Sequence, residues 1–290
     1  MIDRYRNAHR IRWARATLAA KDSGSTPSAL RLARDFMMEW VRERAQLREE
    51  RQLLSQVRAG HDVCWWADEG SAEPLVTILI PTYNRGRIVA ERALTSAVQQ
   101  TYQRLEILVV GDSADPATAG AVASVRDPRI RFENLLRRGL YPAAARNRWM
   151  VAGATPINVG HALARGTWIA PCDDDDELTP DHVELLLAAA RSQRVEFVHS
   201  VADVEGADGS WTELGEPELR EGRVSHGSVL YASTLGFMSF STTSWKLMEP
   251  TDWNVWRRMQ EIGVRIGYLP KVTYRHYMEG LDRDGLRPER

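Results

Sequence analysis

Three short apolar runs, each followed at once by polar residues, constrain the fold of this chain most strongly. An apolar run of this length is typical of a strand that is buried on both faces. Patterns typical of helices separate the runs, and strands that alternate with helices predict βαβ units and a mostly parallel sheet, hence an α/β fold. Runs and helical patterns follow one another at 75–80, 87–100, 105–110, 117–125, 157–165 and 168–171.

The polar clusters that end these runs should meet at one edge of the sheet, where ligands of open parallel sheets bind. The first cluster holds Tyr83, which can pack on a base, and the second holds Asp112, which can accept from a base N–H or a ribose hydroxyl. The third is the run Asp173–Asp176. Adjacent carboxylates repel one another unless a cation holds them, and Mn²⁺ or Mg²⁺ prefers oxygen ligands. The clusters therefore favour a metal-bound nucleotide over a solvated acidic turn.

Other features exclude several classes of protein. The formal net charge of −1 argues against nucleic-acid binding. Neither a Gly-x-x-x-x-Gly-Lys-Ser/Thr loop nor a Gly-x-Gly-x-x-Gly turn is present. Only Cys64 and Cys172 are cysteines, which fits a reducing compartment. The sequence contains no apolar run of about 18 residues and no signal-peptide core at its start, so we expect a cytoplasmic protein.

Residues 1–70 differ in pattern and are expected to form a helical N-terminal extension. Residues 1–58 carry 13 Lys/Arg against 7 Asp/Glu. The helix should begin near Ser25–Ser28 and should pack on the main domain or on another subunit, as a homo-oligomer. The alternative is a peripheral contact with anionic lipid at the inner face of the membrane, although Glu49 and Glu50 weaken it. The expected inward side chains are Leu30, Ala33, Met37, Trp40, Leu47 and Leu54.

The rest of the chain should complete the domain and end in a flexible tail at 281–290. Between the second and third runs we expect a short strand and a helix, with Thr155-Pro156 separating that helix from the next. Residues 215–250 are expected to be loop-rich. The remaining elements are predicted at 129–132 (strand), 143–152 (helix), 180–192 (helix), 195–201 with 210–213 (hairpin), 252–262 (helix), and 265–269 and 272–274 (short strands).

From about Val76 to His276 the chain resembles the family 2 glycosyltransferases, inverting enzymes of the GT-A fold that use nucleotide-diphospho-sugars. The chain departs from the family pattern where Gly111 and Thr251 stand, since both positions more often carry an acid. The family's Ala-Arg-Asn segment corresponds either to Asn147 or to Asn158. Five ordered pieces carry the resemblance, at 76–85, 108–113, 158–170, 173–176 and 252–270.

The resemblance implies specific roles. Asp252 would be the general base, and Asp173, Asp175 and His276 would hold a divalent metal, Mn²⁺ or Mg²⁺. Five loop residues are candidates for acceptor contacts, namely His226, Tyr231, Ser239, Thr242 and Trp245. Nucleotide-sugar binding would fall to Pro81, Thr82, Tyr83, Asn84, Arg85, Asp112, Asn158, Asp173 and Asp174.

The expected protein is a metal-dependent glycosyltransferase of glycan or glycoconjugate biosynthesis. It would take a nucleotide-diphospho-sugar, with a UDP-sugar favoured, and a glycan or small-molecule acceptor. Residues 71–180 would bind the donor and residues 181–280 the acceptor. The alternative is a non-catalytic nucleotide-sugar or carbohydrate-binding protein on a GT-A scaffold. A sugar-phosphate nucleotidyltransferase would need a Gly-rich basic loop where Pro81 to Asn84 stand.

Overall fold

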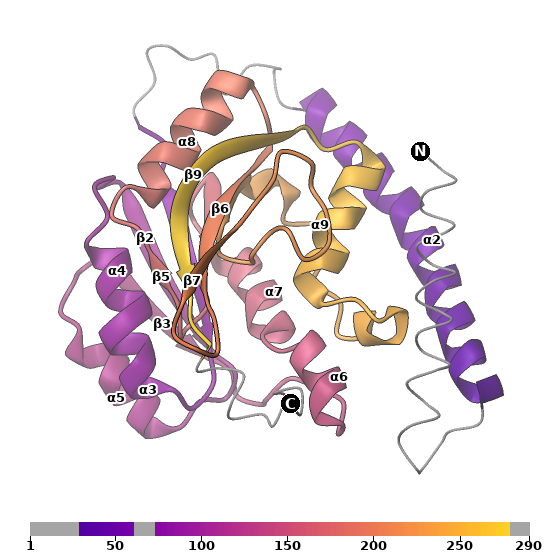
Figure 1. Cartoon of the computed structure of the whole chain (residues 1–290), viewed down its shortest axis with the longest axis horizontal. Coiled ribbons are helices and arrows are strands. Elements are labelled where there is room, and N and C mark those ends of the chain that lie inside the picture. The colour runs from indigo at the N-terminus through magenta and orange to yellow at the C-terminus, as the bar shows by residue number, and fades with distance from the viewer. Residues whose placement is uncertain (1–28, 61–72, 279–290) are drawn as a thin grey trace.

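The computed structural model describes residues 29–60 and 73–278 (Figure 1). Its strands form one mostly parallel sheet in the order β3-β2-β1-β4-β8-β6-β9-β5, with β7 paired to β6. The three apolar runs are strands β1, β2 and β4, as the sequence predicts. The strands are β1 (Val76–Thr82), β2 (Leu105–Gly111), β3 (Ile130–Asn134), β4 (Trp168–Pro171), β5 (Glu177–Leu178), β6 (Phe197–Glu205), β7 (Trp211–Leu214), β8 (Val229–Ala232) and β9 (Ile266–His276).

Strand direction decides which side chains share an edge of the sheet. Strands β2 and β4 pair with β1 in parallel, and Thr82 is in register with Gly111. Strand β8 is antiparallel to both β4 and β6, whereas β9 is parallel to β6. The ends of β1, β2, β4 and β9 and the start of β8 therefore lie at the same edge.

Helices cover both faces of the sheet (Figure 1). One core cluster joins inward residues of β1 such as Ile78 and Ile80 to the α3–α5 side and to α8. The other joins Leu79 to α7, α9 and α2. The helices are α2 (Ala29–Gly60), α3 (Gly86–Ile88), the π-helical η1 (Val89–Leu94), α4 (Thr95–Val98), α5 (Pro116–Ser124), α6 (Ala145–Met150), α7 (Ala154–Leu163), α8 (His182–Gln193), η2 (Ser233–Leu235), η3 (Ser244–Leu247) and α9 (Thr251–Ile262).

Residues 215–250 are loop-rich as expected, but they also contain β8, a four-residue apolar strand between Gly- and Ser-rich turns. Two other expectations about secondary structure were wrong. The two short strands near the C-terminus are one strand, β9, which continues through Pro270 with register shifts against β6. Pro156 does not break a helix but lies in the first turn of α7. Backbone N–H groups in a first turn have no partner within the helix, so a proline there costs no hydrogen bond.

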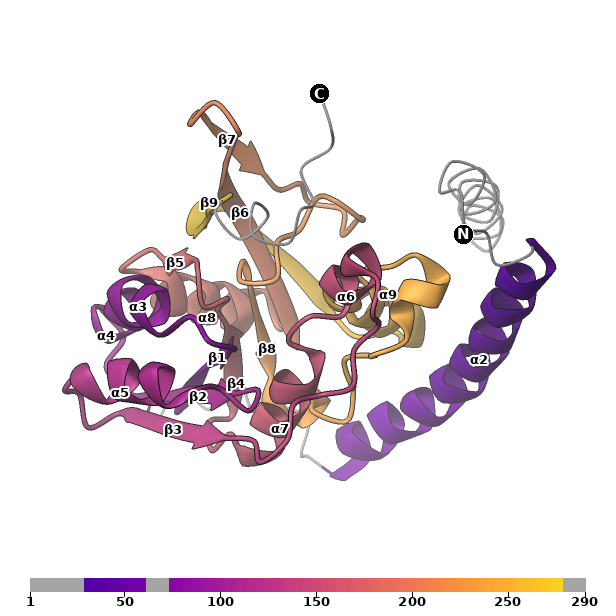
Figure 2. The ribbon, with the colours of Figure 1, turned by 90° about the horizontal axis from the view of Figure 1, so that it is seen from below.

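Helix α2 packs on the main domain, as one of the two predicted arrangements requires. In Figures 1 and 2 it lies at the outer side of the molecule, with α9 between it and the sheet. Leu47 and Leu54 are buried as expected, but Met37 is 52% exposed. Glu39, Glu43 and Glu50 are buried in its place. Met37 was therefore misassigned, because the inward face holds acids that the main domain pairs: Arg257 and Arg258 of α9 bind Glu43 and Glu50, and Thr243 binds Glu39.

Some expectations fall on residues outside the described part of the chain. These include the start of the N-terminal extension, Cys64 and the tail at 281–290. Across the residues that the structure does describe, no helix combines the length and the apolar character needed to cross a bilayer.

Candidate active site

A cavity of about 880 Å³ opens at the predicted edge of the sheet. The ends of β1, β2, β4 and β9 and the first turn of α9 all contribute to it. The cavity therefore brings together almost all the residues that the sequence singled out. These are Pro81, Thr82, Tyr83, Asn84, Arg85, Asp112, Asp173, Asp174, Asp175, Asp252 and His276.

The acidic turn after β4 is held by Arg85. The Nη1 atom of Arg85 lies 3.0 Å from Asp174 Oδ1 and 2.5 Å from Asp175 Oδ2. The Thr82 hydroxyl donates to Asp174 Oδ2 at 2.7 Å. Burial, together with Asp176 and Asp174, still raises the pKa of Asp175 to about 7. Burial and the neighbouring carboxylates thus disfavour the ionised form of Asp175, which a cation bound at the turn would favour.

Asp176 supports the site from behind and is fully buried. It accepts hydrogen bonds from the Tyr274 hydroxyl at 2.6 Å and from the Tyr277 backbone N–H at 2.8 Å. Nδ1 of His276 lies 2.7 Å from Asp176 Oδ2. Burial would lower the pKa of His276, but the bond to Asp176 raises it to about 9. Asp176 thereby ties the end of β9 to the acidic turn.

His226 is a site residue that the sequence placed only among the acceptor candidates. Its Nδ1 lies 2.9 Å from Asp173 Oδ1, and the side chain is 8% exposed. Burial opposes a charge on this ring, yet Asp173 and then Asp252 raise the pKa of His226. In turn, burial opposes ionisation of Asp173, but His226 lowers the pKa of Asp173. His226 therefore connects Asp173 of the acidic turn to the α9 side of the cavity.

The two residues predicted to contact a base have more partners than the sequence suggested. Asp112 accepts from the Gly139 N–H at 2.8 Å and from the Tyr141 hydroxyl at 2.7 Å. The Arg138 guanidinium lies 3.7 Å from the centre of the Tyr83 ring. The segment after β3 thus covers the two residues predicted to contact the base, and no local pattern in the sequence signals this.

Asp252 lies in the first turn of α9, and its Oδ1 accepts the Trp253 N–H at 2.7 Å. Burial raises the pKa of Asp252 above its ordinary value, and His226 only partly offsets this. A carboxylate with a raised pKa is a stronger base. Asp252 lines the same cavity as the acidic turn.

Asn158, which was predicted to bind the nucleotide-sugar, contacts the backbone of Phe240 instead of lining the cavity. Its Nδ2 donates to Phe240 O at 2.9 Å and its Oδ1 accepts from Phe240 N at 2.8 Å. The side chain therefore fixes the Phe240 backbone, and it is not among the residues that line the described cavity. Of the five acceptor candidates, only His226 is among the described residues that line the cavity.

The side chains at and beside the acidic turn are of the types that bind divalent metals in proteins. Asp173 and Asp175 offer carboxylate oxygens. The Nδ1–H of His276 donates to Asp176, which leaves Nε2 for a metal, an arrangement typical of metal-binding histidines. Within residues 29–60 and 73–278, however, no three His, Cys, Asp or Glu side chains are gathered as a ready metal site.

Comparison with known families identifies one match. A family model described as "Glycosyl transferase family 2" matches residues 77–244. The matched segment includes Asp112 and Asp173–Asp176 and ends before Asp252.

Curated relatives match parts of the chain. The succinoglycan biosynthesis protein ExoO of Rhizobium meliloti is 34% identical over 148 residues, which are 50% of this chain and 38% of that protein. A chondroitin synthase of Pasteurella multocida is 24% identical over 225 residues, which are 71% of this chain and 21% of that protein. The chain thus spans roughly a fifth to two fifths of the length of these relatives.

Solved structures share the fold. TarS of S. aureus in complex with UDP-GlcNAc has a TM-score of 0.56 at 18% identity, over 70% of this chain and 58% of that chain. The mannosyltransferase PcManGT from Pyrobaculum calidifontis, in complex with GDP-Man and Mn²⁺, has a TM-score of 0.51 at 16% identity, over 81% of this chain and 67% of that chain. The predicted GT-A fold is confirmed by this likeness, which shows the fold alone.

Proposed function

The chain belongs to glycosyl transferase family 2, and on this premise we propose that it transfers a sugar from a nucleotide-diphospho-sugar to an acceptor hydroxyl, with inversion at the anomeric carbon. One observation carries the proposal. Asp112, the acidic turn and Asp252 come from distant parts of the chain and line a single cavity. Residues 71–180 supply the donor side and residues 181–280 supply Asp252 and the acceptor side.

The donor side suits a nucleotide. Arg138 covers one face of the Tyr83 ring, and the side chain is still 37% exposed at the cavity, where a base can pack against the remaining ring surface. Asp112 keeps lone pairs beyond the two that Gly139 and Tyr141 use, so a base N–H or a ribose hydroxyl can still be accepted. Solved structures of similar fold carry UDP-GlcNAc, UDP or GDP-Man. We favour a UDP-sugar as the donor.

The acidic turn would hold a divalent metal, Mn²⁺ or Mg²⁺, through Asp173, Asp175 and His276. A cation bound there supplies positive charge against the diphosphate of the donor. Asp176 orients the His276 ring, and Arg85 holds Asp174 and Asp175 in place. Burial, and after it Asp176 and Asp174, raises the pKa of Asp175, and a bound cation would offset this cost of ionising the carboxyl.

Asp252 would act as the general base. It accepts the proton of the acceptor hydroxyl while that oxygen bonds to the anomeric carbon. The bond from this carbon to the diphosphate breaks at the same time, and the nucleoside diphosphate leaves with the electron pair. Attack on the face opposite the leaving group inverts the anomeric centre. Relatives named as a succinoglycan biosynthesis protein and a chondroitin synthase favour a polysaccharide or glycoconjugate as the product.

A thermal-shift assay tests the donor site. UDP with Mn²⁺ should raise the melting temperature of the wild-type protein, and Asp175→Ala should abolish this rise. Asp208→Ala, which changes an exposed carboxylate on the β6–β7 turn, is the matched control and should keep it. A wild-type protein that UDP and Mn²⁺ do not stabilise would disprove the donor site.

Product analysis tests the base. Asp252→Asn should keep the UDP-induced shift and lose sugar transfer, since the amide cannot accept the proton. Turnover at the wild-type rate would remove Asp252 from this role.

A further inference from the structure

The structure sorts the charges of helix α2 between its two faces. The helix contains seven arginines and five acids, which from the sequence alone look like a mixed polar surface. Three of the acids, Glu39, Glu43 and Glu50, are buried. Six of the arginines are exposed, whereas Glu49 is the one acid on the helix classed as exposed.

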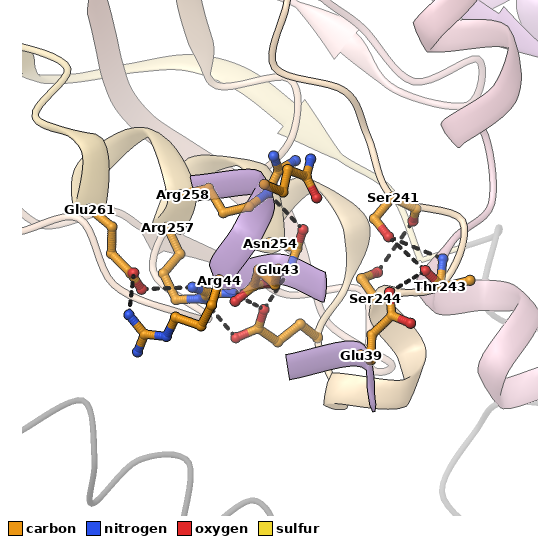
Figure 3. A network of polar contacts seen from close by, with 12 residues as sticks. Glu39, Glu43, Arg44, Ser241, Thr243, Ser244, Asn254, Arg257, Arg258 and Glu261 are labelled. Carbon is orange, nitrogen blue, oxygen red and sulfur yellow. Dashed lines mark hydrogen bonds and ion pairs between the residues drawn. The ribbon is translucent and has the colours of Figure 1, made fainter. Parts of the chain in front are cut away.

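The buried acids are neutralised from the domain side (Figure 3). Glu43 Oε2 lies 2.7 Å from Arg257 Nη2 and accepts from Asn254 Nδ2 at 2.9 Å. Glu50 pairs with Arg258. Glu39 accepts from the Thr243 hydroxyl. Glu43 and Glu50 are therefore paired within the fold, whereas Glu39 also lies 3.5 Å from Arg42 and Asp35 lies 3.1 Å from Arg34. The six exposed arginines of the helix thus face only three acids that α9 does not pair, Asp35, Glu39 and Glu49.

The outer face also carries apolar side chains. Met37, Met38 and Val41 are 52%, 53% and 55% exposed. They lie within one and a half turns of one another, three and four residues apart, and so share a side of the helix with Arg34 and Arg48, each seven residues from Val41. A cluster of large exposed apolar side chains ringed by arginines is a feature of helices that lie in a membrane interface.

We propose that the outer face of α2, defined by Arg34, Met37, Met38, Val41, Arg42 and Arg48, binds the surface of an anionic lipid bilayer. Arginines attract the anionic headgroups, and the three apolar side chains enter the headgroup boundary. A second copy of the chain is a poorer occupant, because two such faces would bring like charges together. No described residue of α2 lines the active-site cavity, so the bilayer contact leaves the cavity open.

Vesicle co-sedimentation of the full chain tests this proposal. The protein should sediment with vesicles of phosphatidylcholine and phosphatidylglycerol and stay in solution with phosphatidylcholine alone. One arginine near an anionic bilayer changes the affinity about fivefold. The triple variant Arg34→Glu, Arg42→Glu, Arg48→Glu should therefore bind at least about a hundredfold more weakly. Its melting temperature should match that of the wild type, which shows that folding is intact.

A matched control reverses three exposed arginines elsewhere, Arg87→Glu, Arg104→Glu and Arg126→Glu, and should keep nearly all binding. A second variant, Met37→Ser, Met38→Ser and Val41→Ser, should bind at low salt but detach as salt screens the remaining charges.

Equal binding of all variants, or no binding of the wild type to anionic vesicles, would overturn the proposal. It would also be overturned if sedimentation equilibrium showed a dimer that the Arg→Glu triple dissociates, while neither protein binds vesicles. In that case the face joins two copies of the chain.

Discussion

Replacing Glu50 by alanine should destabilise the protein severely, because Glu50 is the acid that neutralises Arg258. Arg258 is fully buried on α9, and it also donates to Asn254 Oδ1 and Ser239 O, which are both uncharged. Truncation of Glu50 therefore leaves a buried guanidinium without an opposing carboxylate among the described residues. Arg257, one residue earlier, differs because it contacts Glu43, Glu249 and Glu261.

The magnitude follows from this difference in partners. Removing one member of a buried ion pair costs about 3–5 kcal/mol. For a protein of this size each kcal/mol lowers Tm by about 2–4 °C, so Glu50→Ala should lower Tm by roughly 6–20 °C. Glu43→Ala leaves Arg257 with two carboxylates and should cost about 1–3 kcal/mol, the range for a lost buried hydrogen-bond partner. The neighbouring Glu49→Ala changes an exposed residue and should stay within about 0.5 kcal/mol.

Thermal and urea unfolding of the three variants measures the order of their stabilities. The double variant Glu50→Leu, Arg258→Met should recover most of the loss, because a buried pair exchanged for apolar residues is often neutral or stabilising. If Glu50→Ala is no less stable than Glu49→Ala, α2 is not held by this pair, and the inward orientation of its acids is wrong.

Four further variants test the packing and the buried charges of the fold. Gly227→Ala would place a Cβ 2.0 Å from the Tyr274 ring and should push the Tyr274 hydroxyl away from Asp176. The loss of this one charged hydrogen bond should weaken the binding of UDP with Mn²⁺ by about tenfold or more, which calorimetry can measure. Gly160→Ala would place a Cβ 2.3 Å from Leu79 Cδ1 and should cost about 1–3 kcal/mol in urea unfolding, whereas Gly120→Ala, with nothing within 4 Å, should be neutral or stabilising. Burial opposes ionisation of Glu196, but Arg58 and Arg265 lower its pKa to about 2. Because this folded-state pKa is below the ordinary value, Glu196 stabilises the fold above about pH 4.5, and this stabilisation is lost as the pH falls toward 2. Glu196→Gln should therefore be less stable at neutral pH and should lose less stability across that acid window.

The cavity could be predicted because it depends on local patterns. An apolar run marks each strand, and the residues after it must lie at the carboxyl edge of a parallel sheet. This logic places Asp112 and Asp173 correctly at one cavity. It fails for His226, which precedes an antiparallel strand whose place in the sheet depends on long-range pairing. Tyr141 is similar, since its contact with Asp112 arises from a loop that has no periodic pattern.

The orientation of α2 could not be predicted for a different reason. Hydrophobic periodicity treats glutamate as an outward residue, and on that basis Met37 should face the core. The partner that reverses this assignment, Arg258, lies 208 residues later in the chain. Only when α9 packs beside α2 does a buried guanidinium favour Glu50 over an apolar side chain at that position.

Helix α9 connects these two results, because it is fixed on both sides. Its first turn carries Asp252 in the cavity, and Trp256 packs against Phe197 and Tyr231 of the sheet at ring distances of 5.0 and 5.5 Å. On the opposite side Arg257 and Arg258 bind acids of α2. A change in α2 would therefore act on the helix that places Asp252. Although the family match begins at residue 77, α2 is part of the framework of the α9 side of the cavity.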